Sequence, residues 1–195
     1  MKRLLQGLLL ALGLLSVAGC RMGEPGTMFL SMSAYTDRPV VLTEIVVNGQ
    51  PLDITPRVIR GRADATRPRA HASGMLLSYP AGVRGQMLLE VTWVEIASGA
   101  GYSTAAEVPL DRLETSDSGA AEFMPVFAPG GLLIVASDPM PQSGSDTRTR
   151  DIVRLCAARA TAADKNYALD PGELPGLREA LASAQSGPVD SECKR

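Results

Sequence analysis

Apolar and polar positions alternate with a period of two in much of the stretch 27–96, which is the pattern of half-buried β-strands. The run from Val40 to Val47 is apolar and largely β-branched, and Asn48 and Gly49 follow it directly. Because these two residues tolerate the positive φ angles of a type I′ turn, they predict a hairpin. Short apolar runs separated by turn residues are typical of antiparallel sheet.

Three further segments predict strands, at 76–79, 86–96 and 132–136. In the second of them, Leu89, Val91 and Trp93 share one face and alternate with polar residues. We therefore expect Trp93, the single tryptophan, to belong to the core rather than to a ligand platform. The third is apolar throughout and too short for a helix, so it is read as a buried strand.

The pattern changes after a loop-like stretch at 138–146 that is rich in Pro, Ser, Gly and Asp. A helix is predicted over 148–163, with one face formed by Ile152, Leu155, Cys156 and the aliphatic stem of Arg159. A second helix is predicted over 175–184, with its apolar face formed by Leu177, Ala180, Leu181 and Ala184. The expected fold is thus a mainly β domain over 27–140, an antiparallel β-sandwich or strongly curved sheet, followed by a helical segment over 141–195 packed on it.

The first twenty residues have the pattern of an export signal. Lys2 and Arg3 precede an apolar run from Leu4 to Leu15, which is shorter than the ~20 residues that a membrane-spanning helix needs. Three small residues and a cysteine follow closely, namely Val17, Ala18, Gly19 and Cys20. Because this order resembles the lipobox of bacterial lipoproteins, we expect removal of 1–19, acylation of Cys20 and a short tether over 20–26. The alternative is an ordinary secretory signal with a chance cysteine at its end.

The residue after Cys20 is Arg21. In the bacterial sorting rule, aspartate at this position favours retention in the inner membrane. The expected location is therefore the outer membrane, with the domain held by its lipid anchor on the periplasmic side.

If Cys20 carries lipid, Cys156 and Cys193 remain as an even pair in a compartment that permits disulfides. We predict that they are bonded, with two buried free thiols as the alternative. A zinc site is a weak competitor, because the chain has one histidine, His71, far from both cysteines in the sequence.

Charge narrows the range of partners. Without Lys2 and Arg3 the chain has 17 basic and 21 acidic residues, a net charge near −4, which does not suggest a nucleic-acid binder. The one basic cluster lies in a Pro- and Ala-rich segment read as a long loop, and consists of Arg57, Arg60, Arg62, Arg67 and Arg69. Its conceivable partners are anionic lipid headgroups, an acidic protein surface or solvent alone. If the chain has a partner-binding surface, this loop is the first candidate.

No catalytic residues are predicted, because His71 has no Ser or Cys in a recognisable motif and no nucleophile elbow or zincin motif occurs. Four residues offer oxygens in an order similar to a calcium loop, namely Asp164, Asn166, Asp170 and Glu173. The spacing departs from the EF-hand, since Leu169 stands where glycine is needed and Glu173 comes two residues early. Asp170, Pro171 and Glu173 fit a helix start better, so no metal or cofactor is expected.

Four short motifs span about 31–137: Tyr35, Thr36, Asp37 and Arg38; Val47, Asn48 and Gly49; Val91, Thr92 and Trp93; and Phe127, Pro129 and Gly130. With them the chain resembles an uncharacterised family of small bacterial lipoproteins, of the domain-of-unknown-function type, often found beside lipase effectors of type VI secretion systems. The chain departs from the family pattern ahead of Pro80, where Leu76, Leu77 and Ser78 replace common cysteines.

The resemblance implies an immunity protein, not an enzyme, that waits in the periplasm and blocks a toxic phospholipase by covering its active site or fixing its lid. A structural or assembly lipoprotein of a cell-envelope machine is the second hypothesis. A small-ligand module is the third, and it would require a deep pocket in the sheet.

Overall fold

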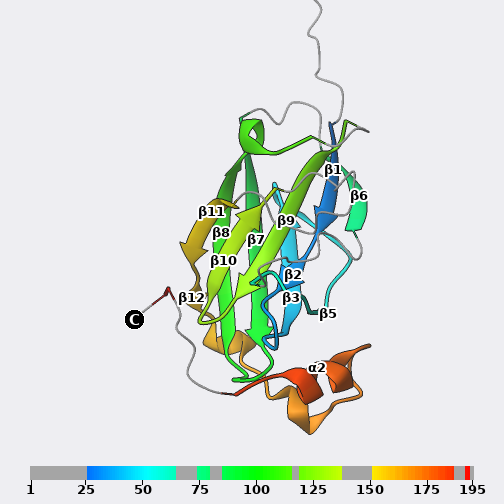
Figure 1. Ribbon diagram of the computed structural model, residues 1–195, viewed down its shortest axis with the longest axis vertical. Helices are drawn as coiled ribbons and strands as arrows, with labels where there is room; N and C mark the ends of the chain where they lie inside the picture. The colour runs from blue at the N-terminus through cyan, green and yellow to red at the C-terminus, as the bar shows by residue number, and fades with distance from the viewer. Residues whose placement is uncertain are drawn as a thin grey trace, which may run out of the picture.

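The computed structural model describes residues 26–64, 74–79, 85–115, 119–137, 151–186 and 192–193. The chain folds into two six-stranded sheets that lie as two layers, with a short helix, α2, below one end of the strands (Figure 1). The prediction of a mainly β chain with a C-terminal helix is confirmed. The predicted signal peptide and the lipidation site at Cys20 lie outside the described residues.

The first sheet is mixed rather than wholly antiparallel. In spatial order it consists of β11 (Asp151–Cys156), β10 (Leu132–Ala136), β9 (Ala121–Ala128), β1 (Gly26–Ser31) and β6 (Gly74–Tyr79), with β2 (Ser33–Ala34) beside β9. β1 and β2 both run parallel to β9, with Met28 opposite Ala121 and Ser33 opposite Val126. The expectation of antiparallel pairing throughout is wrong at these pairs. A parallel pair needs a long crossover, and here most of the second sheet lies between the two partners in the sequence.

The second sheet is antiparallel. In order it consists of β12 (Ala158–Arg159), β8 (Gly101–Pro109), β7 (Gln86–Glu95), β3 (Val40–Val47) and β4 (Gln50–Pro51), with β5 (Arg57–Ile59) also on β3. The hairpin predicted at Asn48 and Gly49 is confirmed, since Val47 pairs with Gln50 across the turn. Both turn residues have positive φ, 50° and 76°, as a type I′ turn requires.

The helix predicted over 148–163 is wrong. From Asp151 on, the segment forms β11, which extends the first sheet, then β12, which extends the second, and then the 3₁₀ turn η2 (Thr161–Ala163). Hydrogen bonding to the open edges of β10 and β8 outweighs the intrinsic helix propensity of its alanines, which is a weak preference. The expected helical segment over 141–195 is therefore partly sheet.

Three other helical turns occur in the described residues, η1 (Leu110–Arg112), η3 (Tyr167–Leu169) and α2 (Leu177–Ser183). The predicted apolar face of the last helix is confirmed, because Leu177 and Ala180 are buried and Leu181 and Ala184 pack beside them on the outer side of β3 and β7. The helix begins at Leu177 with Gly176 as its N-cap, close to the predicted start at 175. The separate expectation that Asp170 caps a helix is wrong, because no helix begins at Pro171. None of the helices in these described segments has the length and apolar character needed to cross a bilayer.

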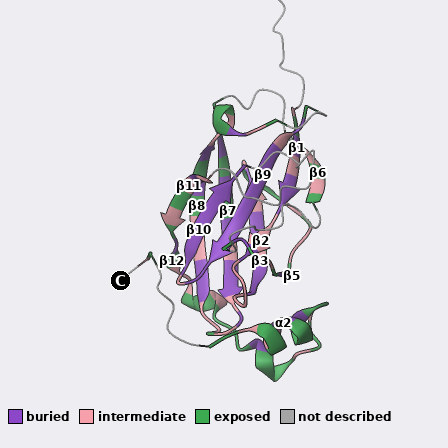
Figure 2. Ribbon diagram, viewed as in Figure 1, coloured by how far each residue is buried: buried purple, intermediate pink, exposed green. Residues whose placement is uncertain are grey.

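One apolar core joins the two sheets. Met28, Leu30, Phe123 and Phe127 of the first sheet pack with residues of the second, including Trp93, in a single cluster. Figure 2 shows that buried residues run along the central strands of the domain, among them β7, β9 and β10. Trp93 is 0% exposed and its ring lies 5.7 Å from that of Tyr102 and 5.2 Å from that of Phe127. The prediction that Trp93 belongs to the core is confirmed.

The strands β9 and β10 are buried on both faces, which is why their sequences read as continuous apolar runs. Met124, Val126 and Ile134 point away from the main core into a second cluster, against which Tyr35 and Cys193 pack. The predicted disulfide is present in the structure, with Cys156 and Cys193 at an S–S distance of 2.04 Å. It joins strand β11, rather than a helix, to the C-terminal tail.

Gly131 occupies a position that excludes any side chain. Its φ is +80°, and an added Cβ would lie 2.4 Å from the ring of Tyr102, which is itself packed on Trp93. We expect Gly131→Ala to lower the free energy of unfolding by about 2 to 4 kcal/mol, from backbone strain and overpacking together. Gly119→Ala is the matched control, since Gly119 also has φ +80° but open space around it. Urea unfolding should show a loss of about 1 kcal/mol there, and equal losses at both sites would contradict the steric argument.

Asp164 ties η2 to β8 and β12. One carboxylate oxygen accepts the Gly101 N–H at 2.7 Å, and the carboxylate pairs with Arg159 at 2.9 Å. These contacts lower the pKa of Asp164 below its ordinary value, and the hydrogen bond from the Gly101 backbone N–H has the largest effect. Stabilisation by a carboxyl with a lowered pKa is complete above the unfolded-state value and lost as pH falls through the folded-state value.

We therefore expect Asp164→Asn to flatten the decline of stability below about pH 4, where ordinary aspartates begin to protonate. Thermal unfolding between pH 2.5 and pH 7 measures this change. Asp111→Asn, at an exposed carboxylate in η1, is the control and should keep the wild-type slope. An unchanged slope for Asp164→Asn would contradict the role of the carboxylate.

Candidate functional site: the Arg38 cavity

A cavity of about 200 Å³, here called the Arg38 cavity, opens at one end of the two sheets. It lies where β3 begins at Val40, where β7 ends at Glu95 and where β9 ends at Ala128. Because β9 runs parallel to β1, this end is remote from Gly26, where β1 begins. The strands thus bring together residues that are far apart in the sequence.

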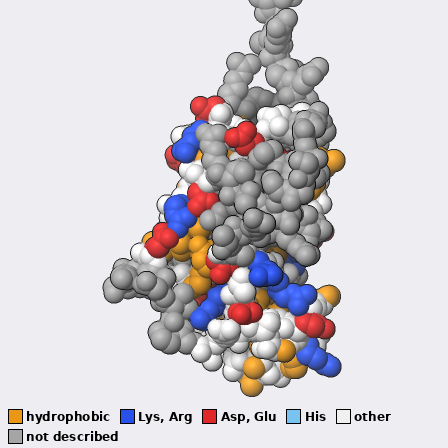
Figure 3. Space-filling model, in the orientation of Figure 1, with side chains coloured by type: hydrophobic (Ala, Val, Ile, Leu, Met, Phe, Trp, Pro, Cys, Tyr) orange, Lys and Arg blue, Asp and Glu red, His pale blue; other side chains and the backbone are white. Residues whose placement is uncertain are grey.

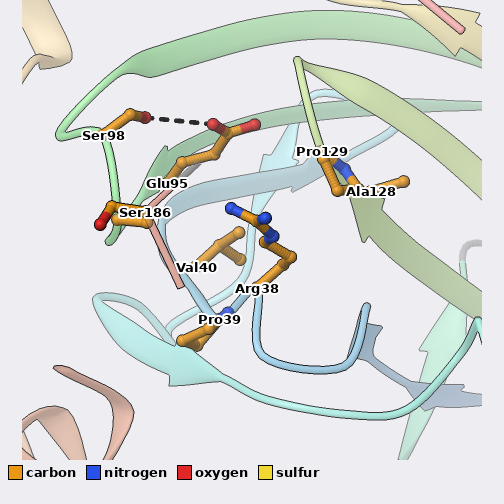
Figure 4. Close-up of a pocket in the computed structure, with 9 residues that line it drawn as sticks. Arg38, Pro39, Val40, Glu95, Ser98, Ala128, Pro129 and Ser186 are labelled. Carbon is orange, nitrogen blue, oxygen red and sulfur yellow. Dashed lines mark hydrogen bonds between the residues drawn. The ribbon is translucent and has the colours of Figure 1, made fainter. Parts of the chain in front are cut away.

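Arg38 is the cationic group of the cavity. Its backbone N–H closes a turn onto the Tyr35 carbonyl at 3.1 Å, and one guanidinium nitrogen, Nη1, donates to the carbonyl of Gln185, just after α2. Gln185 in turn is held by Asp37, whose carboxylate accepts from its side-chain amide at 3.0 Å. Figure 4 shows the guanidinium between Glu95 on one side and Ala128 and Pro129 on the other. Arg38 forms no ion pair with any of the residues that the structure describes.

Glu95 is the anionic group, and it is held from three sides. Its Oε1 accepts the backbone N–H groups of Gly130 at 2.7 Å and Gly131 at 3.3 Å, and its Oε2 accepts the Ser98 hydroxyl at 3.1 Å. The hydrogen bonds from Gly130 and Gly131 link the end of β7 to the turn between β9 and β10, and so join the two sheets at the cavity. Figure 4 shows the hydrogen bond from Ser98 to Glu95. Successive backbone N–H groups of this kind form an anion-binding nest.

The remaining walls are mostly apolar and come from Pro39, Val40, Ala97, Ala128 and Pro129, together with Ser98 and Ser186. The cavity therefore combines a small apolar hollow with one cation and one anion. A cavity of this size and lining is suited to a small group with matched polar atoms rather than to a large apolar ligand.

A second hollow adjoins this end and is lined by Arg60, Arg62 and the segment Tyr35–Asp37. Gly61 allows the backbone of the arginine segment to lie close to Ala34, because an added Cβ at Gly61 would lie 2.7 Å from the carbonyl oxygen of Ala34. The backbone of the arginine segment is tied down by the Asp64 carboxylate, which accepts the Thr36 N–H at 2.6 Å. Figure 3 shows Lys and Arg side chains gathered in the lower half of the molecule, with acidic side chains between them.

Of the five arginines predicted to form a partner-binding loop, the structure describes three. Arg57 is in strand β5 rather than in a loop, and lines a third hollow with Arg60, Leu30 and Met75. Arg60 and Arg62 are exposed beside the Arg38 cavity. The other two predicted residues, Arg67 and Arg69, lie outside the described residues, as does His71.

The acidic residues that suggested a calcium loop do not converge. Asp164 pairs with Arg159, the Asn166 side chain accepts the Ala168 N–H, Asp170 accepts the Gly172 N–H and Glu173 pairs with Lys165. Within the described segments, no group of three or more His, Cys, Asp and Glu residues is arranged to hold a metal ion.

Sequence reasoning missed Glu95 and Ser98 as site residues. A signal was present in the stretch Glu95 to Gly99, where a charged residue ends an alternating strand and turn residues follow. Comparison of the chain with protein-family models, with curated proteins and with solved structures finds no match in any of the three.

Proposed function

We propose that this protein is a lipid-anchored, periplasm-facing immunity protein that binds and neutralises a secreted phospholipase or lipase. One observation carries the proposal. Arg38 and Pro129 belong to two of the motifs on which the family resemblance rests, and although they are about ninety residues apart in the sequence, both line the Arg38 cavity.

The surface around that site has the character of a protein interface. Exposed arginines at 60 and 62 border hollows with apolar walls, and arginine is enriched at interfaces because its planar fork forms bidentate hydrogen bonds. The hollows are built on strand ends that a shared core holds rigid, as in a β-sandwich, the architecture that we infer from the two layers. Rigid strand ends suit anchor residues at the centre of an interface.

Anchor geometry favours a protein partner over lipid headgroups. If Cys20 is acylated, the six residues to Gly26 span at most roughly 20 Å, so the start of β1 stays near the bilayer. β1 and β2 lead away from that point over about 30 Å of extended chain. We therefore expect Arg38, Arg60 and Arg62 to lie at the end of the domain remote from the anchor.

The test is capture and inhibition with the full-length protein in mild detergent. We expect it to retain a lipase from a lysate of the producing bacterium and to inhibit that lipase's hydrolysis of phospholipid vesicles. Arg60→Ala with Arg62→Ala should weaken the inhibition at least about tenfold. Arg112→Ala, in η1 at the opposite end, is the control. Retention of envelope-machine subunits without a lipase would favour the structural alternative, and retention of nothing would also count against immunity.

The anchor has its own test. Cys20→Ser should move the protein from the membrane fraction to the soluble periplasm, because no acyl chain can then be attached. Unchanged membrane fractionation with an uncut signal would contradict lipidation.

A further inference from the structure

We propose that the Arg38 cavity binds the carboxy-terminal residue of a peptide chain, with an apolar side chain of about leucine size. The assignment to a chain terminus, rather than to a free amino acid, rests on the proposed protein-binding function. The chemistry of the cavity carries the rest of the argument.

The carboxylate position follows from Arg38. A guanidinium has five N–H groups, and only one contact of this guanidinium is made within the described residues, to the carbonyl of Gln185. The group is held by that contact and directed into the cavity (Figure 4). Its remaining donors are matched by a carboxylate, which accepts bidentate hydrogen bonds from arginine.

Glu95 favours a ligand that has a hydrogen-bond donor next to its carboxylate. A second anion in the same cavity would repel a simple carboxylic acid, whereas a donor next to the carboxylate would turn the repulsion into attraction. Among the described residues, the Oε2 atom accepts only the Ser98 hydroxyl, so it keeps further acceptor capacity. The carboxy-terminal residue of a peptide has this pattern, because its amide N–H is attached to the same carbon as its carboxylate.

Size and lining specify the side chain. A cavity of about 150 Å³ holds a benzene molecule, so about 200 Å³ accommodates one branched aliphatic residue but not a lipid or a nucleotide. Pro39, Val40 and Ala128 provide the apolar wall for it.

The experiment measures ligand binding by saturation-transfer NMR on the full-length protein in detergent, and the signal of a detergent-only sample is subtracted. The probes are N-acetyl-leucine, which has a carboxylate and an amide N–H, N-acetyl-leucinamide, which lacks the charge, and free leucine. We expect a dissociation constant in the millimolar range for N-acetyl-leucine, and binding at least about tenfold weaker for the amide. This comparison needs no variant and so does not depend on one that folds.

Arg38→Gln should weaken N-acetyl-leucine binding to the level of the amide, and Arg38→Lys should fall between, because lysine keeps the charge but not the fork. Arg112→Gln is the matched control and should bind like wild type. Equal binding of acid and amide, or no saturation by either, would overturn the proposal. Tighter binding of free leucine than of N-acetyl-leucine would overturn the assignment to a chain terminus and transfer the cavity to free amino acids.

The two proposals fail separately. Binding of N-acetyl-leucine that depends on Arg38, without inhibition of any lipase, would keep the cavity assignment and remove the immunity function. Inhibition of a lipase without binding of N-acetyl-leucine would keep the immunity function and remove the cavity assignment.

Discussion

Trp93→Ala is expected to lower the free energy of unfolding by about 4 kcal/mol, within the range for removal of a fully buried aromatic side chain. The side chain is 0% exposed and fills the space between the sheets, in contact with rings from β8 and β9. Because folded domains are stable by roughly 5 to 15 kcal/mol, this loss removes a large part of the total. Urea unfolding followed by circular dichroism measures it.

Leu88→Ala is the control on the same strand. Leu88 lies on the outward face of β7 and is 38% exposed, so its loss should cost about 1 kcal/mol or less. If Trp93→Ala does not fold, Trp93→Phe gives the second measurement, with an expected loss of about 1 to 2 kcal/mol. Losses at Trp93 no larger than that at Leu88 would show that the layers do not depend on this contact.

Removing the disulfide with Cys156→Ser and Cys193→Ser is expected to cost about 3 to 4 kcal/mol. The two cysteines are 37 residues apart, and the bridge stabilises the fold mainly by restricting the unfolded chain, more for longer loops. The loss is increased by the position of Cys193, which packs against the outer apolar face of β9 and β10. Thermal unfolding of both proteins, with and without reductant, measures the effect.

Reductant serves as the internal control. It should lower the Tm of the wild type towards that of the double variant and leave the variant unchanged, since the variant has no bridge to reduce. A wild-type Tm that does not respond, at a mass that shows two free thiols, would show that the bridge contributes no stability.

Several strands were predictable because their signals are local. β3 and β10 have the bounds that their apolar runs predicted, and the hairpin after β3 depends on two adjacent residues that both accept positive φ. In β7 the alternation itself sorts buried from outward positions, and Trp93 falls on the inner side. Burial on one face imposes a period of two on the sequence, and that period can be read without knowing the partner strand.

β9 was missed because it violates a local rule. Pro125 lies inside this strand, although proline cannot donate a ladder hydrogen bond. The pairings explain its presence, since β1 pairs with β9 as far as Phe123 and β2 resumes at Val126, so Pro125 stands opposite the break between them. The position is acceptable only because a neighbouring strand is interrupted there.

β11 was predicted as helix for a related reason. Ile152, Leu155 and Cys156 fit a helical spacing, and Val153 and Leu155 equally fit an alternation. The edge of β10 decides between them, because it offers unpaired backbone groups along the whole segment. That edge is formed by residues about twenty positions earlier in the chain, so the sequence of the segment alone cannot indicate it.

By itself the sequence determined the mainly β class, the hairpin, the buried tryptophan and the pairing of Cys156 with Cys193, since each follows from local periodicity, turn chemistry or an even cysteine count. Only the tertiary structure decided the parallel pairs, the two strands built from an apparent helix, and the Arg38 cavity. The cavity joins Arg38, Glu95, Pro129 and Ser186, which come from four separate segments. Sheet pairing places these side chains together, and pairing is a property of the whole chain rather than of any one segment.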